Sequence, residues 1–117
     1  MTTKKYALEN FSEIESVRCP CGQSRRAFAA LEGAPATVHC VEISADARTH
    51  YHKKLTEIYV ILEAGADACM ELDGALIPVK AFSTILIKPG CRHRAVGKMK
   101  VINTSIPAFD PDDEWFD

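Results

Sequence analysis

The segment ARTHYHKKLTEIYVILEAG, residues 47–65, decides both the expected fold and the expected site. It contains His50 and His52, two of the four histidines of the chain, and Glu57 follows five residues after the second. In an extended strand, alternate side chains point to the same face, so the two imidazoles lie side by side. Residues 53–56 suffice for a turn that returns Glu57 to the pair at the start of the next strand. The spacing therefore predicts that two imidazoles and one carboxylate meet at one point.

Short apolar runs separated by turn signals surround this segment and predict an all-β domain. The runs cover residues 36–44, 57–65, 83–90 and 98–106. Residues 67–80 predict two strands around the turn Asp73–Gly74, and Pro78 marks its strand as an edge or a bulge. Strands at intervals of about ten residues are typical of an antiparallel sandwich or barrel.

Two segments before residue 36 carry weaker signals. Residues 10–17 predict a short helical turn, capped by Asn10 or Ser12. Residues 24–33 contain helix formers and end in glycine, which fits a turn or two of helix. Residues 26–31 fit a strand equally well, so both alternatives stay open here.

The composition limits the classes of function. The chain has 117 residues, the size of one domain, with 47% hydrophobic and 26% charged residues and a net charge of −2. No broad basic field is present for nucleic acid or an anionic membrane, and no apolar run approaches the ~20 residues of a membrane span. The first residues lack a secretory h-region, so we expect a cytoplasmic protein. Five cysteines, an odd number, argue against a disulfide framework.

A third imidazole extends the predicted site. His93 follows the turn signal Pro89–Gly90 in the segment ILIKPGCRHRAVG, and this turn can aim the side chain inward. Three imidazoles and one carboxylate form a nitrogen-rich set that suits Fe(II), Mn(II), Ni(II), Cu(II) or Zn(II) better than Mg(II) or Ca(II). Four protein ligands leave up to two positions of an octahedral ion for water, dioxygen or substrate.

These residues make the chain resemble the cupin superfamily. The stretch HYHKKLTE fits the HxH-x4-E part of the first cupin motif, and KPGCRH keeps the glycine and histidine of the second. The resemblance implies that His50, His52, Glu57 and His93 bind a divalent transition metal. It also implies a jelly-roll β-barrel of antiparallel strands around the metal, commonly in a homodimer that exchanges strands.

The resemblance covers residues 36–105, and the C-terminal tail also looks like that of many small single-domain cupins. The chain departs from the family pattern at turn and packing positions, not at ligands. The departures are Ala45, Ala64, Ala81 or Phe82, Lys88 and Gly97. We expect a segment of residues 1–35 packed on the barrel, a barrel of residues 36–106 and a tail of residues 107–117, with the aromatic side chains of the tail docked and its acids facing water.

Several other side chains are candidates for the pocket. Tyr59 shares a face with Glu57, and Cys91 lies two residues before His93, so both are expected near the ion. Cys19 and Cys21 are read either as thiols packed in an ordered segment, which we favour, or as part of a lid, in which Arg25 or Arg26 would bind a carboxylate or phosphate as a fork. The remaining cysteines, Cys40 and Cys69, are expected in the core, and His39 is expected as a packed or surface imidazole.

Two main hypotheses about function follow. The first is a metal-dependent enzyme for a small polar molecule, with dioxygenase chemistry if the ion is Fe(II), or isomerase or lyase chemistry with Mn(II), Zn(II) or Ni(II). The second is a non-catalytic, metal-dependent module that binds a small molecule or sugar. A proton-transfer group beyond the four ligands would favour the enzyme. A scaffold or storage role fits poorly, because an idle site would not need the complete ligand set.

Overall fold

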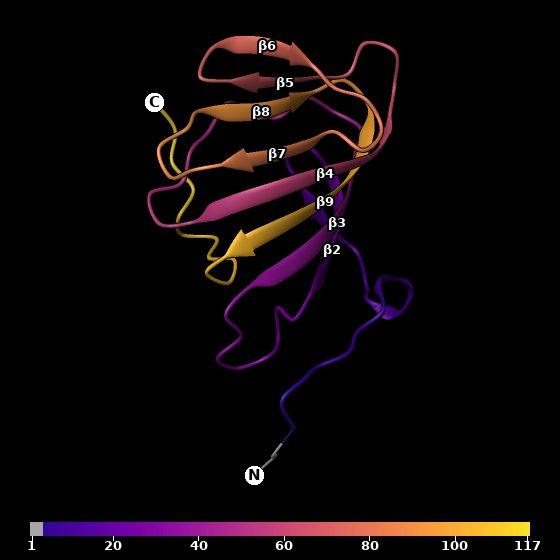
Figure 1. The fold of residues 1–117 in the computed structure, drawn as a ribbon, viewed down its shortest axis with the longest axis vertical. Helices are drawn as coiled ribbons and strands as arrows, with labels where there is room; N and C mark the ends of the chain where they lie inside the picture. Colours follow the sequence, from indigo (N-terminus) through magenta and orange to yellow (C-terminus); the bar gives the residue numbers. More distant parts are fainter. Residues whose placement is uncertain (1–3) are drawn as a thin grey trace.

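The chain folds into two antiparallel β-sheets, whose strands are labelled in Figure 1. The structure, a computed structural model, describes residues 4–117. The larger sheet has the order β1-β2-β3-β9-β4-β7 and the smaller sheet the order β6-β5-β8. The strands are β1 (Val17–Cys19), β2 (Gly22–Ala27), β3 (Thr37–Ile43), β4 (Thr56–Ala64), β5 (Cys69–Leu72), β6 (Ala75–Pro78), β7 (Thr84–Ile87), β8 (His93–Val96) and β9 (Met99–Ile106). The predicted antiparallel all-β fold is confirmed.

The turn chemistry agrees with the sequence. Asp73 and Gly74 join β5 to β6 with φ values of 48° and 84°, the positive values that a tight two-residue hairpin needs. Pro78 ends β6, which is an edge strand. The predicted helical turn is the 3-10 helix η1 (Phe11–Glu13), and the Asn10 side chain accepts a hydrogen bond from the backbone of Ser12.

The N-terminal region contributes strands to the larger sheet. Residues 22–27 form β2, which pairs with β3 over six residues, and residues 28–33 form turns. The strand alternative for residues 26–31 is therefore right only for Arg26 and Ala27, and the helical alternative is wrong. β1 and β2 are joined by a tight turn and extend the sheet beyond the predicted barrel. The predicted division at residues 35 and 106 stays a prediction, and residues 1–3 of its first segment lie outside the described residues.

The inward side chains of the larger sheet form rows that cross the strands, because paired residues point to the same face. One row is apolar apart from Ser24 and comprises Ser24, Val41, Val101 and Ile61. The next row toward the other end is polar and comprises Arg26, His39, Asn103 and Tyr59. A third row contains Thr37, Ser105, Glu57 and Ile87. The interior therefore has an apolar half and a mainly polar half, and Ile87 of the third row belongs to the hydrophobic core.

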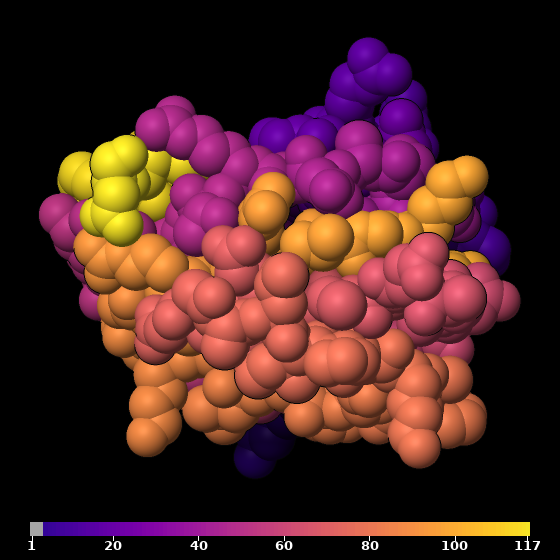
Figure 2. All heavy atoms as spheres, turned by 90° about the horizontal axis from the view of Figure 1, so that it is seen from above, coloured from indigo at the N-terminus to yellow at the C-terminus, as the bar shows by residue number. Residues whose placement is uncertain are grey.

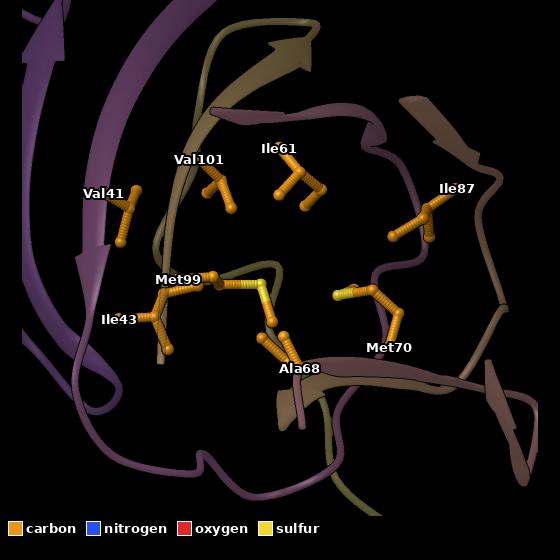
Figure 3. Packing of buried hydrophobic residues seen from close by; sticks show 9 residues of the cluster. Val41, Ile43, Ile61, Ala68, Met70, Ile87, Met99 and Val101 are labelled. Carbon is orange, nitrogen blue, oxygen red and sulfur yellow. The ribbon is translucent and has the colours of Figure 1, made fainter. Parts of the chain in front are cut away.

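The apolar half is the hydrophobic core. Figure 3 shows aliphatic side chains of the larger sheet pointing toward Ala68 and Met70 from the smaller-sheet side. Ile61, Met70 and Val101 are fully buried. Cys40 and Cys69 were expected in this core but are only half-buried and lie outside it. This packing holds the two sheets together and leaves the opposite end of the interior for polar groups.

The C-terminal tail closes over the segment that carries the histidine pair. In Figure 2 the yellow tail residues lie beside magenta atoms of that segment. The backbones of Tyr51 and Trp115 exchange hydrogen bonds of 3.0 and 2.9 Å, and Asp117 forms a bidentate pair with Arg92. The expectation that all tail acids face water is wrong for Asp113, which is 3% exposed. Its carboxylate is buried because it accepts hydrogen bonds from backbone N–H groups, as described below.

The only helix in the described part of the chain is η1, which has three residues. None of residues 4–117 belongs to a helix with the length and apolar character to cross a membrane.

Candidate metal centre

The four predicted ligands converge on one point in the polar half of the interior. His50 and His52 precede β4, Glu57 is the second residue of β4, and His93 begins β8. One potential ligand atom from each residue lies within 4.8 Å of all the others. Three of the four side chains are buried, and His50 is half-buried. The structure thus brings together residues that are up to 43 positions apart in the sequence.

The turn between His52 and Glu57 depends on an acid from the tail. The Asp113 carboxylate accepts hydrogen bonds from the backbone N–H groups of Lys53, Lys54 and Leu55, at 2.9 to 3.0 Å, and from Trp115 Nε1 at 3.0 Å. Burial raises the pKa of Asp113, but these donors outweigh it and lower the pKa to about 2. The buried carboxylate therefore stays charged and fixes the loop that positions Glu57.

Backbone carbonyls orient all three imidazoles. The Nδ1 atom of His50 contacts the carbonyl of Arg48 at 3.1 Å, and that of His93 contacts the carbonyl of Cys91 at 2.9 Å. His52 Nδ1 makes a short contact to the carbonyl of Asp113. A carbonyl can only accept, so each Nδ1 carries a hydrogen, and in the neutral form of the ring Nε2 holds a lone pair. This arrangement of the outer ring nitrogen is typical of metal-binding histidines.

The carboxylate of Glu57 faces two of these lone pairs. Its Oε1 lies 2.9 Å from His52 Nε2 and 3.0 Å from His93 Nε2. Its Oε2 accepts a hydrogen bond of 2.6 Å from Asn103 Nδ2. Burial raises the pKa of Glu57, but the two imidazoles outweigh it and hold the pKa well below its usual range. A charged acceptor opposed by lone pairs requires a cation between them, either protons on the rings or a metal ion.

The donor set fits a transition-metal ion. His52 Nε2 is buried and has no hydrogen-bond geometry to any neighbour in the described part of the chain, despite its short distance to Glu57. Such an unsatisfied nitrogen is expected where an ion completes the contact. An ion about 2.1 Å from each donor holds neighbouring donors about 3 Å apart in octahedral geometry. The contacts of Glu57 to His52 and His93 match that spacing.

A cavity of about 130 Å³ opens beside this cluster. Tyr59 and Arg26, both predicted pocket residues, line it together with His50, His52 and Glu57. The third candidate, Cys91, is not among its lining residues. The Cys91 thiol packs against the hydrophobic core, and only the backbone carbonyl of this residue serves the site, by orienting His93.

The two N-terminal thiols lie at this cavity instead. Cys19 and Cys21 flank the turn between β1 and β2, line the cavity, and place their sulfur atoms 3.3 Å apart. The hydrogen bond from the Cys21 thiol lowers the pKa of Cys19 to about 6, although burial opposes this shift. The same hydrogen bond and burial raise the pKa of Cys21 far above the usual range. Both thiols also pack against the hydrophobic core at the end of a paired strand, which agrees with the favoured reading of an ordered, packed segment, and the lid alternative stays a prediction.

His39 lines the cavity as a neutral imidazole. Its Nε2 lies 2.9 Å from Thr37 Oγ1, and its ring meets that of Phe109 edge-on at 5.2 Å. Burial, assisted by the charge of Arg26, lowers the pKa of His39 to about 4, against the opposing effect of Glu57. The residue is packed, as expected, and does not belong to the ligand cluster.

Sequence reasoning missed three residues of the site. Asn103 holds Glu57, Asp113 holds the turn, and Ser24 lines the cavity with a buried hydroxyl. A signal existed for Asn103, because it continues the inward alternation of Met99 and Val101 with a polar side chain. The role of Asp113 had no such signal, since its partners are backbone groups 58 to 60 residues away.

Comparison with solved structures identifies the fold of the chain. No protein-family model matches the chain, and no curated protein matches it. Among solved structures, a protein from Planctomyces limnophilus is 44% identical over 98% of this chain and 100% of its own, with a TM-score of 0.93. An RmlC-like cupin from Shewanella frigidimarina superimposes with a TM-score of 0.71 at 16% identity, over 92% of this chain and 95% of its own. The chain therefore has the cupin fold, and the predicted jelly-roll architecture is confirmed.

The chain also resembles an enzyme of known activity in its fold. Pac13, described as a nucleoside dehydratase, has a TM-score of 0.79 and 20% identity, over 95% of this chain and 89% of its own. A variant of the Streptomyces protein has been solved with uridine, with a TM-score of 0.78 and 21% identity, over 97% of this chain and 89% of its own. At these identities the similarity establishes the shared fold alone.

Proposed function

We propose that this protein is a metal-dependent enzyme that acts on a small polar molecule. The observation that carries the proposal is the convergence of His52 Nε2 and His93 Nε2 on the buried Glu57 carboxylate, with His50 in the same cluster and each ring held by a backbone carbonyl. Such an arrangement is costly for the folded protein without a cation. The fold is compatible with catalysis, since a structural neighbour is a dehydratase.

Within this proposal, His50, His52, Glu57 and His93 hold an Fe, Mn, Ni or Zn ion. The bound ion supplies a Lewis acid that polarises an oxygen atom of the substrate. The adjoining cavity of about 130 Å³ receives a small ligand, or the leading end of a larger one. An iron ion would extend the options to dioxygenase chemistry.

Two side chains of the cavity support proton transfer and so favour isomerase or lyase chemistry. Burial, followed by the charge of Glu57, raises the pKa of Tyr59 well above its usual value, so its phenol keeps a proton to donate. Cys19, with a pKa of about 6, is a thiolate at neutral pH and can accept one. Titratable groups whose environments push their pKa values apart are the usual acid and base of an active site. The non-catalytic binding module stays the alternative if turnover is absent.

Metal content tests the proposal directly. We expect the purified protein to retain about one transition-metal ion per chain after dialysis, and the His52→Ala variant to lose most of it, because one of four donors is removed. The His39→Ala variant is the matched control, since His39 is buried in the same cavity but lies outside the cluster. Full metal occupancy in His52→Ala would overturn the metal centre.

Turnover is tested next with the metal-loaded protein. Small hydroxy and oxo acids and phenols are incubated with it while oxygen uptake and product masses are recorded. Isomerase or lyase chemistry gives a product without oxygen uptake, and dioxygenase chemistry consumes oxygen. A ligand that binds without either change supports the binding module instead.

We also propose that this protein forms a homodimer through the outer face of its larger sheet. The solvent side of a sheet normally carries polar residues. Here two outward rows bring together Val38, Ile58, Leu86, Val60 and Ile102. Leu86 is 58% exposed. Burying such a surface against a second copy would remove apolar area from water.

Light scattering after gel filtration checks the assembly. We expect a mass of twice the 12.9 kDa chain for the native protein and a shift toward the single-chain mass for Leu86→Glu. Leu76→Glu is the control, because Leu76 is 61% exposed on β6 of the other sheet. A native protein that elutes as a monomer at high concentration would contradict the dimer.

The expected compartment is the cytoplasm. The five cysteines, all within the described residues, are free thiols. Free thiols are typical of a reducing compartment. Fractionation of the native host, with the protein detected by antibody, would test this placement.

A further inference from the structure

The cavity beside the metal centre contains a cation without a partner. The guanidinium of Arg26 forms no ion pair and donates no hydrogen bond among residues 4–117, and its Nε is buried. Glu57 lines the same cavity but is not available, because its two oxygens are engaged by His52, His93 and Asn103. Arg26 is half-buried, and a charged group whose Nε is buried without an acceptor is unfavourable, so the arrangement favours an anionic ligand.

The position of the guanidinium is fixed by an aromatic ring. Arg26 Cζ lies over the Phe109 ring, 4.7 Å from its centroid. Phe109 is itself held, because its backbone N–H donates to Thr37 Oγ1 at 2.9 Å and its ring meets His39 edge-on. Stacking occupies the flat face of a guanidinium and leaves the N–H groups along its edge free for a bidentate acceptor.

Two further polar atoms in this cavity lack partners. The hydroxyl of Ser24, a residue that is 2% exposed, has no hydrogen-bond partner, and neither does Oδ1 of Asn103, which is 8% exposed. Because Asn103 Nδ2 must face the Glu57 carboxylate, Oδ1 is fixed as an acceptor that points elsewhere. An anion can satisfy Arg26 and Ser24, whereas Asn103 Oδ1 requires a donor such as a hydroxyl group.

We propose that Arg26 binds the carboxylate of a small hydroxy acid and thereby sets the substrate class of this protein. Ser24 donates to the same carboxylate, and Asn103 Oδ1 accepts from the hydroxyl. This assignment rests on the proposed function in one respect: the acid that binds Arg26 is taken to be the substrate of the metal centre. The size agrees, because a cavity of about 150 Å³ is enough for benzene, and lactate has the same number of heavy atoms.

The test uses metal-free, ¹⁵N-labelled full-length protein and two probes of the same shape. Lactate carries the carboxylate and hydroxyl, and lactamide replaces the charged carboxylate with a neutral amide. We expect lactate to shift the Nε–H resonance of Arg26 and to bind at least about tenfold more tightly than lactamide, the difference that a charged hydrogen bond makes. Propionate, which lacks the hydroxyl, should bind more weakly than lactate.

Variants then assign the binding to Arg26. Arg26→Gln should lose the preference for lactate, and Arg26→Lys, which keeps the charge but not the fork, should retain part of it. Arg25→Gln is the matched control: Arg25 is the neighbouring residue, is exposed, and donates to the backbone carbonyl of Phe11 instead. Circular dichroism confirms that each variant is folded, and if Arg26→Gln is not, the Lys variant and the resonance shift decide.

The outcomes separate this proposal from the metal centre. Equal binding of lactate and lactamide, or an unmoved Arg26 resonance with all three probes, would overturn the carboxylate subsite. Tighter binding of inorganic phosphate than of lactate would also overturn it in favour of a phosphate site. If lactate binds through Arg26 but the protein retains no metal, the subsite stands and the proposed metal-dependent function falls.

Discussion

At the scale of single residues, the Cys19 thiol has the most unusual environment. Its pKa of about 6 makes it mostly thiolate at pH 7, whereas burial and the neighbouring Asp73 raise the pKa of Cys91. We expect iodoacetamide at pH 7 to alkylate Cys19 roughly tenfold faster than Cys91, because the thiolate is the nucleophile. Peptide mass spectrometry over a time course measures both rates.

A variant checks the cause of that reactivity. Cys21→Ala removes the thiol that donates to Cys19, so the pKa of Cys19 should rise and its alkylation at pH 7 should slow. Raising the pH should then restore the rate. If Cys19 in the variant reacts as fast as in the native protein, the hydrogen bond is not what activates it.

Also at this scale, the four clustered residues were predictable because each signal was local. The spacing of His50, His52 and Glu57 needs only the period of a strand and a short turn, and His93 follows a clear turn signal. Arg26 and Asn103 were harder, because their meeting depends on the order of strands β2, β3 and β9 in the sheet. Strand order is a long-range property that spacing along the chain does not determine.

At the scale of elements, the tail fixes the turn before β4 through Asp113. Its pKa is lowered from 3.8 to about 2, so the folded state gains stability that is fully present above about pH 4 and is lost as the pH falls through about 2. Asp113→Asn places an amide N–H group against backbone donors. We expect it to lower the free energy of unfolding at pH 7 by about 2 kcal/mol.

Urea denaturation across a pH series measures this contribution. The difference between the native protein and Asp113→Asn should shrink as the pH falls toward 2, where the native carboxyl is also neutral. Asp112→Asn serves as the control because Asp112 is exposed, and it should change stability little. A difference between native and Asp113→Asn that is the same at every pH would show that charge is not the cause.

The elements themselves were predicted unevenly. The hairpin at Asp73–Gly74 and strands β3, β4, β7 and β9 carry strong local signals and were found where expected. β8 was missed, because its four residues, HRAV, give a short and partly charged run that has no strand pattern of its own. It pairs with β5, so tertiary contact and not local propensity decides its conformation.

At the scale of the whole molecule, the interior is divided into a core and a site. Ile61 is fully buried in the apolar half. Its row lies two rows along β4 from the row that carries Glu57. Ile61→Ala should lower the free energy of unfolding by about 2–5 kcal/mol, as for other large-to-small core changes. The metal content of the folded variant should stay close to that of the native protein.

Thermal melting with elemental analysis of the same samples makes the comparison. Leu76→Ala is the control, because its side chain is exposed and should cost little stability. A folded Ile61→Ala protein that retained much less metal would contradict the separation of the two halves.

The three carbonyls that orient the imidazoles have a consequence for mutations. They belong to the main chain of Arg48, Cys91 and Asp113, and every amino acid supplies the same carbonyl. Point mutations at residues 48 and 91 therefore leave the acceptors in place as long as the backbone keeps its path. Substitutions there would disturb the packing of Cys91 on the core or the contact of Arg48 with Phe116, but they would keep the direction in which the imidazoles point.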